Sequence, residues 1–320
     1  MKFYNFFILN FMLLSPLMMM SSNSFMMMWI MLEINSMSFI FLSSTEKSNK
    51  IKKENFIFMY IIQSISSMMI IIYIMNTNNL QLSMNNSSSM ILLTALLMKM
   101  NMFPFHKWSI IIMKIMSLKN FMIYSSWQKI APIFLLMKFN NLSMMMIMLM
   151  INAMIMTMLQ FNMKMMKMLL IYSSMIHSSW MLMPIKFNSM NSMMYLIIYS
   201  MILMTLIMAM KKMNMWIFSM YFNNSFFTMM VMILSLAGIP PLTGFLLKWI
   251  MFNSLIEFYN NPMMLTTIMI TLTMNFYIYS KFIFMNMFLI MNNMITNMNM
   301  HKNMYSYLTN LIMPMIFIAM

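Results

Sequence analysis

The sequence predicts an all-α, polytopic membrane protein with about eleven transmembrane helices, two of them broken. Its 320 residues are 62% hydrophobic and only 7% charged, whereas soluble domains carry about 25% charged residues. Apolar runs of about 20 residues, the length that crosses a bilayer, recur along the whole chain. No stretch is long and polar enough for a soluble domain. We therefore expect residues 1–320 to form a single integral membrane domain.

Hydropathy divides the chain into eleven apolar segments that are separated by short polar loops. The expected spans are 3–20, 22–42, 56–75, 88–118, 120–138, 143–160, 167–184, 190–210, 223–258, 262–287 and 304–320.

Two of these segments, 88–118 and 223–258, are too long to be single straight helices. The first contains Pro104, and the second contains Pro240 and Pro241, with the two glycines of the chain on either side. Proline removes a helical hydrogen bond, so we expect both segments to be broken helices. Irregular backbone at membrane depth is tolerated inside protein or beside a water-filled cavity, and such pairs of broken helices often mark a transport site.

The lysines between the spans predict the orientation of the chain. With the N-terminus on side one, that side receives eleven loop lysines and the other side two, and membrane proteins concentrate loop lysines on the cytoplasmic or matrix side. Sixty-six methionines and no arginine further indicate an A/T-biased organelle genome. We expect a mitochondrial inner-membrane protein with a matrix N-terminus and a C-terminus in the intermembrane space. Side one would hold Lys2, Lys47, Lys50, Lys52, Lys53, Lys119, Lys164, Lys167, Lys211, Lys212 and Lys302, and the other side Lys138 and Lys186.

Composition argues against several classes of function. The net charge of +15 comes from 19 lysines against four glutamates, but the lysines lie between apolar runs, so a nucleic-acid partner is not expected. The chain has no cysteine, which excludes disulfides, iron–sulfur ligation and thiolate metal sites. There is also no phosphate loop, dinucleotide fingerprint or hydrolase triad. We expect no cofactor or metal to be bound by this chain, and lipid to surround it.

Four titratable groups fall deep inside the spans: Glu33, Lys99, Lys129 and Lys248. A charged side chain at the middle of a bilayer costs roughly 2.5–3.5 kcal/mol on insertion scales, which indicates a functional use. Each lysine lies near a proline, where freed carbonyls and water can solvate an ammonium. A single lysine in a span can also be explained without a function, because its long side chain can bring the ammonium to the membrane–water interface. Three lysines and an acid together favour function.

Lysine chemistry suits a proton relay. Burial favours the neutral amine, whereas a nearby carboxylate favours the ammonium, so movement of a partner charge loads or releases the proton. Two histidines are further candidates. His106 follows Pro104 and either relays protons or caps the broken helix. His177 lies mid-span among serines and either serves proton relay or hydration or has a structural role. Glu46, Glu54 and Glu257 are expected to be solvated or interfacial.

Several motifs give the chain a resemblance to a known family. WIMLEINSMSFI, STEKS followed by IIQSISS, LLMKMNMFPFHKW, SSWQKIAPI, YSSMIHSSWML and LSLAGIPPLTGFLLKW occur in this order over residues 27–250. The chain resembles the antiporter-like membrane-arm subunits of NADH:ubiquinone oxidoreductase, respiratory complex I. The resemblance implies an antiporter-like fold, here shortened at the N-terminus, and proton translocation coupled to quinone reduction elsewhere in the complex.

The resemblance also implies roles for the buried charges. Glu33 would pair with Lys99, Lys129 would be the central relay, and Lys248 would end the path towards a neighbouring antiporter-like chain. His177 would lie on the hydrated axis. NADH, FMN, iron–sulfur clusters and ubiquinone are implied in other subunits, and the partners would include small membrane subunits. The chain has Asn101, Met102 and Phe103 where the family has small residues, so we expect the break near Lys99 to depend on Pro104 alone.

Two other functions fit the same sequence. A subunit of a secondary cation/proton antiporter would share the fold and the buried charges. A structural scaffold without a proton path would keep coupled pumping when Lys129 is replaced by alanine.

Overall fold

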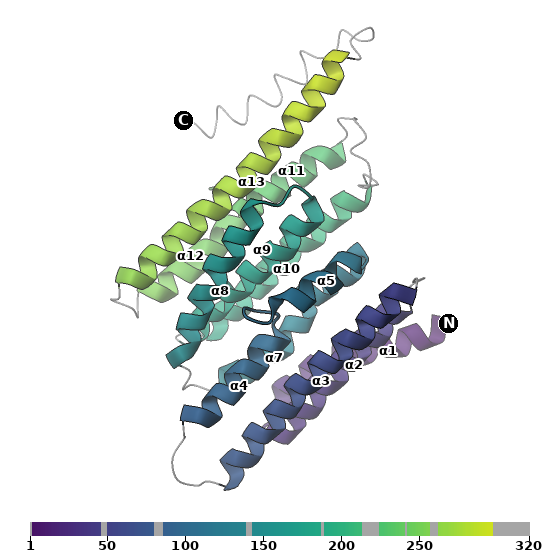
Figure 1. The fold of residues 1–320 in the computed structure, drawn as a ribbon, viewed down its shortest axis with the longest axis vertical. Helices are drawn as coiled ribbons and strands as arrows, with labels where there is room; N and C mark the ends of the chain where they lie inside the picture. Colours follow the sequence, from purple (N-terminus) through teal and green to yellow (C-terminus); the bar gives the residue numbers. More distant parts are fainter. Residues whose placement is uncertain are drawn as a thin grey trace.

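The computed structural model describes residues 2–45, 50–79, 86–138, 143–186, 189–212, 224–240, 242–256 and 262–296. Within these ranges every regular element is a helix, and the helices lie side by side in one elongated bundle (Figure 1). The all-helical fold class is therefore confirmed. The elements are α1 (Lys2–Ser21), α2 (Phe25–Ser44), α3 (Lys50–Asn79), α4 (Asn86–Lys99), α5 (His106–Ile115), α6 (Leu118–Ser125), η1 (Trp127–Lys129), α7 (Ile130–Lys138), α8 (Ser143–Phe161), α9 (Met166–Leu182), η2 (Met183–Lys186), α10 (Ser189–Lys212), α11 (Asn224–Ala237), α12 (Thr243–Ile256) and α13 (Pro262–Thr296).

Six helices in the described part of the chain are long and apolar enough to cross a membrane, and three shorter apolar helices accompany them. The eleventh expected span, 304–320, lies outside the described residues, as do Glu46, Glu257 and Pro241. The count of about eleven spans and the side assigned to each terminus therefore remain predictions.

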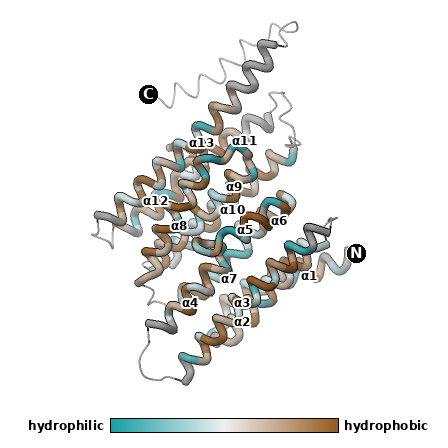
Figure 2. The backbone as a smooth tube through the Cα atoms, in the orientation of Figure 1, coloured by the Kyte–Doolittle hydropathy of each residue, from teal (hydrophilic) through white to brown (hydrophobic). Residues whose placement is uncertain are grey.

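Large apolar side chains cover the outer surface of the bundle. Helices α1, α3, α10 and α13 carry exposed Phe, Ile, Met and Tyr along their lengths, for example Phe11 at 58% and Met201 at 61% exposure. Soluble proteins rarely show continuous apolar patches of this kind, whereas lipid tails solvate them. Hydrophilic residues in Figure 2 also occur within the bundle, near the labels of α5 and α7. The polarity of this protein is thus partly internal.

Helix α9 forms the centre of the bundle. Nearly all of its residues are buried, although it carries four serines and a histidine in SSMIHSS. Each of these serine hydroxyls donates to the carbonyl three residues earlier, as Ser173 does to Leu170 at 2.9 Å. The backbone carbonyls of α9 thereby accept hydrogen bonds from all four serine hydroxyls. This local bonding permits a polar helix in the core and fixes the position of His177.

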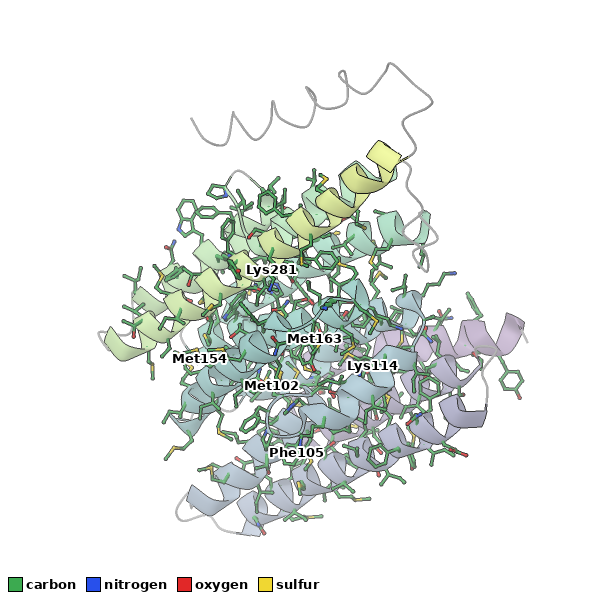
Figure 3. All side chains as sticks on the ribbon, turned by 45° about the horizontal axis from the view of Figure 1, so that its top comes forward. Met102, Phe105, Lys114, Met154, Met163 and Lys281 are labelled. Carbon is green, nitrogen blue, oxygen red and sulfur yellow. The ribbon has the colours of Figure 1, made fainter. Side chains whose placement is uncertain are left out.

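The segment 88–118 contains two helices, α4 and α5, joined by a short non-helical connection at Met100–Phe105. Asn101 has a φ of 60°, its N–H donates to the carbonyl of Met98, and Met102 N–H donates to Leu97 at 3.0 Å. This pattern is a Schellman motif with asparagine in the left-handed position, where asparagine is one of the few tolerated side chains. Figure 3 labels Met102 and Phe105 within the bundle.

The expectation that this break depends on Pro104 alone is wrong. Helix α4 ends before the proline, because the left-handed backbone at Asn101 already turns the chain away from the helix axis. Side chains from other helices hold the connection. Tyr124 donates to Asn101 Oδ1 at 2.8 Å, and the Phe103 N–H donates to Asn152 Oδ1 at 2.8 Å. The Asn101 side chain and the Phe103 backbone N–H therefore anchor the break to neighbouring helices.

The segment 223–258 contains helices α11 and α12, and α11 ends in the same way as α4. Gly238 has a φ of 76°, its N–H donates to Ser235, and the Ile239 N–H donates to Leu234. Helix α12 begins beside the last turn of α11, because a Cβ built on Gly244 would lie 1.5 Å from the carbonyl oxygen of Ser235. Only glycine allows the two helices to approach this closely.

A third interruption lies in a segment that was expected to be one span, although Pro132 was expected to loosen its helix beside Lys129. Residues 118–138 form α6, the 3₁₀ turn η1 and α7 in place of one continuous span. The hydroxyls of Ser125 and Ser126 both donate to the carbonyl of Met122, which competes with the helical hydrogen bonds at the end of α6. Pro132 then falls in the first turn of α7, where a missing N–H is tolerated.

We predict that the left-handed backbone at Asn101 distinguishes two substitutions. Both Asn101→Gly and Asn101→Ala remove the hydrogen bond from Tyr124, but only alanine adds Cβ strain at positive φ. Asn101→Ala should therefore be less stable than Asn101→Gly by about 1 kcal/mol. Unfolding curves of the two purified variants in one detergent measure this difference, and an alanine variant at least as stable as the glycine variant would contradict the Schellman assignment.

Candidate functional site

Lys99 is the last residue of α4 and only 7% exposed. The Glu33 carboxylate on α2 attracts its ammonium electrostatically. Neither Lys99 Nζ nor Glu33 Oε2 has a hydrogen-bond partner within the described residues, and both atoms are buried. The two groups therefore interact across a gap without direct contact. Burying a charge without a hydrogen-bond partner costs free energy. A shared proton or a water molecule between the ammonium and the carboxylate would lower this cost.

A small cavity lined by both polar and apolar side chains lies next to Lys99. It is lined by Leu32, Asn35, Ser36, Met59, Gln63, Lys99, Tyr124, Gln128 and Pro132. The volume in which the centre of a water molecule fits is about 20 Å³. One water molecule requires roughly 10–15 Å³ of such volume. The cavity therefore has room for an ordered water within reach of the Lys99 side chain.

Gln128 connects this cavity with the next lysine along the chain. Its amide nitrogen donates to Oδ1 of Asn35 at 3.2 Å and to the Asn35 carbonyl at 3.4 Å, and the residue directly precedes Lys129. Asn35, Gln63 and Gln128 were not among the residues singled out from the sequence. Their amides lie in apolar spans and would have been the available signal.

Lys129 closes the 3₁₀ turn between α6 and α7 and is 6% exposed. Its Nζ donates to the carbonyl oxygen of Ser174 on α9 at 2.6 Å. The ammonium also lies 5.9 Å from the centre of the Tyr199 ring, within the range of a cation–π interaction. A carbonyl and an aromatic face therefore stabilise the ammonium at this position.

Lys248 lies on α12 and reaches back to the end of α11. Its Nζ donates to the carbonyl oxygen of Ala237, the last residue of α11. The last carbonyls of a helix lack partners within the helix and carry partial negative charge, so they favour an ammonium. Gly238 provides the space, because a Cβ there would lie 2.3 Å from Lys248 Cε.

His177 lies on α9, the helix whose Ser174 carbonyl binds Lys129. It is 2% exposed on α9, and its Nδ1 is hydrogen-bonded to the hydroxyl of Tyr195 at 2.7 Å. The charges of both Lys129 and Lys248 act on its ring. The structure therefore places His177 within electrostatic reach of the central and terminal lysines.

His106 lies apart from this arrangement, in the first turn of α5. Its ring stacks on Phe103 at a centroid distance of 5.9 Å, and the charge that acts on it is that of its neighbour Lys107. These contacts hold His106 on the connection between α4 and α5.

Comparison with known proteins identifies the family. A family model described as "NADH:quinone oxidoreductase/Mrp antiporter, TM" matches residues 22–274. NADH-ubiquinone oxidoreductase chain 2 of Locusta migratoria is 31% identical over 268 residues, which cover 79% of this chain and 76% of that protein. Chain 2 of Mus musculus is 31% identical over 294 residues, with 85% and 82% covered. The resemblance inferred from the motifs is thereby confirmed.

Solved structures show the same fold. A chain of respiratory complex I from Thermus thermophilus with bound aureothin superposes with a TM-score of 0.72 at 16% identity, covering 86% of this chain and 68% of that chain. A chain of the Mrp complex from Dietzia sp. DQ12-45-1b gives a TM-score of 0.74 at 11% identity, covering 86% and 59%. The extent of the family model and the identity to chain 2 relatives show that this chain belongs to the NADH:quinone oxidoreductase/Mrp antiporter transmembrane family.

Proposed function

We propose that this chain is a core membrane subunit of a proton-pumping NADH:ubiquinone oxidoreductase in the mitochondrial inner membrane. The support is the identity of about 30% to chain 2 of that enzyme over most of both proteins. On this proposal residues 1–320 form one membrane domain of about eleven spans, with a matrix N-terminus. Other membrane-arm subunits, including an antiporter-like neighbour and the small membrane subunits, would surround it. NADH, FMN, iron–sulfur clusters and ubiquinone would be bound by other subunits.

The proposed activity of this chain is lateral proton transfer through Glu33, Lys99, Lys129, His177 and Lys248. One observation carries the proposal. Three lysines lie inside an apolar bundle, and each lies at or beside a helix interruption: Lys99 ends α4, Lys129 ends η1, and Lys248 contacts the end of α11. Burying an ammonium group costs free energy, and apolar side chains would fill the same space without this cost. The buried lysines therefore favour a functional role over packing.

Electrostatic repulsion would couple successive sites. At an effective dielectric constant of 20, the repulsion between two unit charges is roughly 4 kcal/mol at about 4 Å and falls to roughly 1.7 kcal/mol at about 10 Å. A proton that arrives at one lysine would therefore disfavour a proton on the next. His177 would transmit this effect, because both Lys129 and Lys248 act on it. His106 is a secondary candidate for the proposed relay: its ring stacks on Phe103, and its Nδ1 is buried without a hydrogen-bond partner among the described residues.

A subunit of a cation/proton antiporter is the second candidate, favoured by the similarity to the Mrp complex. The two candidates differ in their assembly. We expect the native chain to migrate in a very large membrane complex with NADH dehydrogenase activity on a native gel, because its relatives from Locusta migratoria and Mus musculus are chain 2 of that enzyme. Migration alone, or with antiporter subunits, would overturn the first proposal in favour of the second.

We predict that Lys129→Ala abolishes coupled proton pumping in the assembled complex. The variant removes the ammonium that Ser174 and Tyr199 stabilise. Lys138→Ala is the matched control, since Lys138 is exposed at the end of α7. Protons translocated per NADH oxidised, measured in sealed vesicles, should fall for Lys129→Ala and stay at the wild-type value for Lys138→Ala. Intact pumping with Lys129→Ala would favour the scaffold function.

A second prediction concerns the space in front of Lys248. Gly238→Asn keeps a residue that tolerates positive φ, but its Cβ would lie 2.3 Å from Lys248 Cε. Lys248 must then leave the carbonyl of Ala237, and the variant should lose proton pumping to the same extent as Lys248→Ala. Pumping at the wild-type level in Gly238→Asn, together with loss in Lys248→Ala, would show that this contact is dispensable.

A further inference from the structure

Tyr124 is buried where three elements of the candidate site meet. It lies in the last turn of α6, is 4% exposed, and its hydroxyl donates to Asn101 Oδ1 at 2.8 Å. Its ring stacks on Phe39 of α2 at a centroid distance of 5.2 Å. Helix α2 also carries Glu33, and Asn101 lies two residues after Lys99. One tyrosine therefore contacts the helix of the acid and the backbone turn that follows the lysine.

The same tyrosine borders the cavity beside Lys99. Tyr124 lines this cavity together with Gln63 of α3 and Gln128, and the Gln63 side chain interacts with the Tyr124 hydroxyl. Gln128 directly precedes Lys129. The segment 124–129 thus begins at the cavity of one buried lysine and ends at the next, and the hydroxyl of Tyr124 joins it to the end of α4.

The position of the Lys99 ammonium depends on the end of α4. Within the described residues Lys99 Nζ has no hydrogen-bond partner that would hold it, so the backbone sets where the side chain starts. That backbone ends in the left-handed turn at Asn101. Asparagine is tolerated there but does not require this conformation. The hydrogen bond from Tyr124 adds the constraint that the asparagine backbone lacks.

The hydroxyl of Tyr124 has no role in packing. Phenylalanine would fill the same space and stack on Phe39 equally well, whereas a buried hydroxyl requires a hydrogen-bond partner. Asn101 provides that partner. The chain has Asn101 where the family has a small residue, and a small residue would offer no side-chain oxygen to Tyr124. This contact is therefore not among the roles that the resemblance implies.

We propose that Asn101 and Tyr124 form a positioning pair that holds the Lys99 ammonium beside the cavity and apart from the Glu33 carboxylate. The inference rests on the proposed relay, and neither residue exchanges the proton itself. Attraction between opposite charges grows steeply at short distance. A lysine that could reach Glu33 would be held in a direct ion pair, which favours both charged forms and slows proton release. The positioning pair keeps Lys99 able to exchange its proton.

Tyr124→Phe tests the positioning pair, because it removes the hydroxyl and retains the stack on Phe39. We expect about fivefold slower proton translocation at unchanged assembly, the factor that corresponds to one lost hydrogen bond. The readout is the rate of proton translocation in sealed vesicles, driven by NADH, over a series of pH values. Displacement of Lys99 relative to Glu33 should change the pH profile, whereas a purely structural defect lowers the rate by the same factor at every pH.

Asn101→Gly removes the acceptor from the other side and keeps a residue suited to the left-handed backbone. It should slow translocation as Tyr124→Phe does, and it provides the test if Tyr124→Phe does not assemble. Because both substitutions remove the same hydrogen bond, the double variant should pump about as fast as either single variant. Independent effects would multiply to about 25-fold.

Tyr60→Phe is the matched control for the loss of a tyrosine hydroxyl. Tyr60 lies on α3, three residues before Gln63, and is 38% exposed. This variant should translocate protons at the wild-type rate and with the wild-type pH profile. An equal loss in Tyr60→Phe would overturn the assignment to the positioning pair.

The outcomes separate the positioning pair from the relay. Loss of pumping in Lys129→Ala, with slower translocation and a changed pH profile in both pair variants and no further loss in the double variant, supports the proposal. Loss in Lys129→Ala with wild-type rates in the pair variants, with an unchanged pH profile, or with multiplied losses in the double variant, overturns the positioning pair and leaves the relay standing. Wild-type pumping in Lys129→Ala overturns both.

Discussion

The structure depends on one constraint: an ammonium group in an apolar bundle must be solvated by the protein itself. Within a helix nearly all backbone carbonyls accept hydrogen bonds from the helix's own N–H groups. An intact helix therefore has few free acceptors for the ammonium of a buried lysine. Lys248 binds the free carbonyl of Ala237 at the end of α11, whereas Lys129 binds the carbonyl of Ser174 in the middle of α9. Each lysine itself lies at or beside a helix interruption, so the interruptions are part of the site.

The two broken segments use the same backbone motif with different residues. Asn101 and Gly238 both take a left-handed conformation at the end of a helix. Glycine leaves room for the Lys248 side chain, whereas asparagine offers Oδ1 to Tyr124. One break thus opens space for a lysine, and the other is fixed to a neighbouring helix. The same fold element serves two requirements because the left-handed position accepts both residues.

Composition and hydropathy were sufficient to predict the all-helical fold, since lipid requires nearly all backbone groups to be paired within helices. The motifs were sufficient to identify the family. The cause of the α4–α5 break was missed, because the left-handed preference of Asn101 is weaker than the signal of Pro104 and depends on the contact from Tyr124. The end of α6 before Lys129 was not predicted from the sequence, because it depends on serine hydroxyls that hydrogen-bond to nearby backbone carbonyls.

The charged members of the candidate site could be predicted as types and positions, because a lysine in an apolar span is conspicuous whatever its neighbours are. Their mutual arrangement could not. The contact of Lys129 with Tyr199 joins residues 70 positions apart in the sequence, and tyrosine is common in membrane helices for reasons unrelated to proton transfer. Only the packing of α10 against α9 reveals that Tyr195 and Tyr199 contact His177.

We expect a continuous polar path through the core from Lys99 to Lys248. A structure of the assembled complex at a resolution that shows ordered water would reveal this path. It should contain water in the cavity beside Lys99 and Gln128 and beside His177 Nε2, which is buried without a partner among the described residues, so that hydrogen bonds connect the three lysines. Apolar side chains in direct contact across both places, with no water between the lysines, would contradict it.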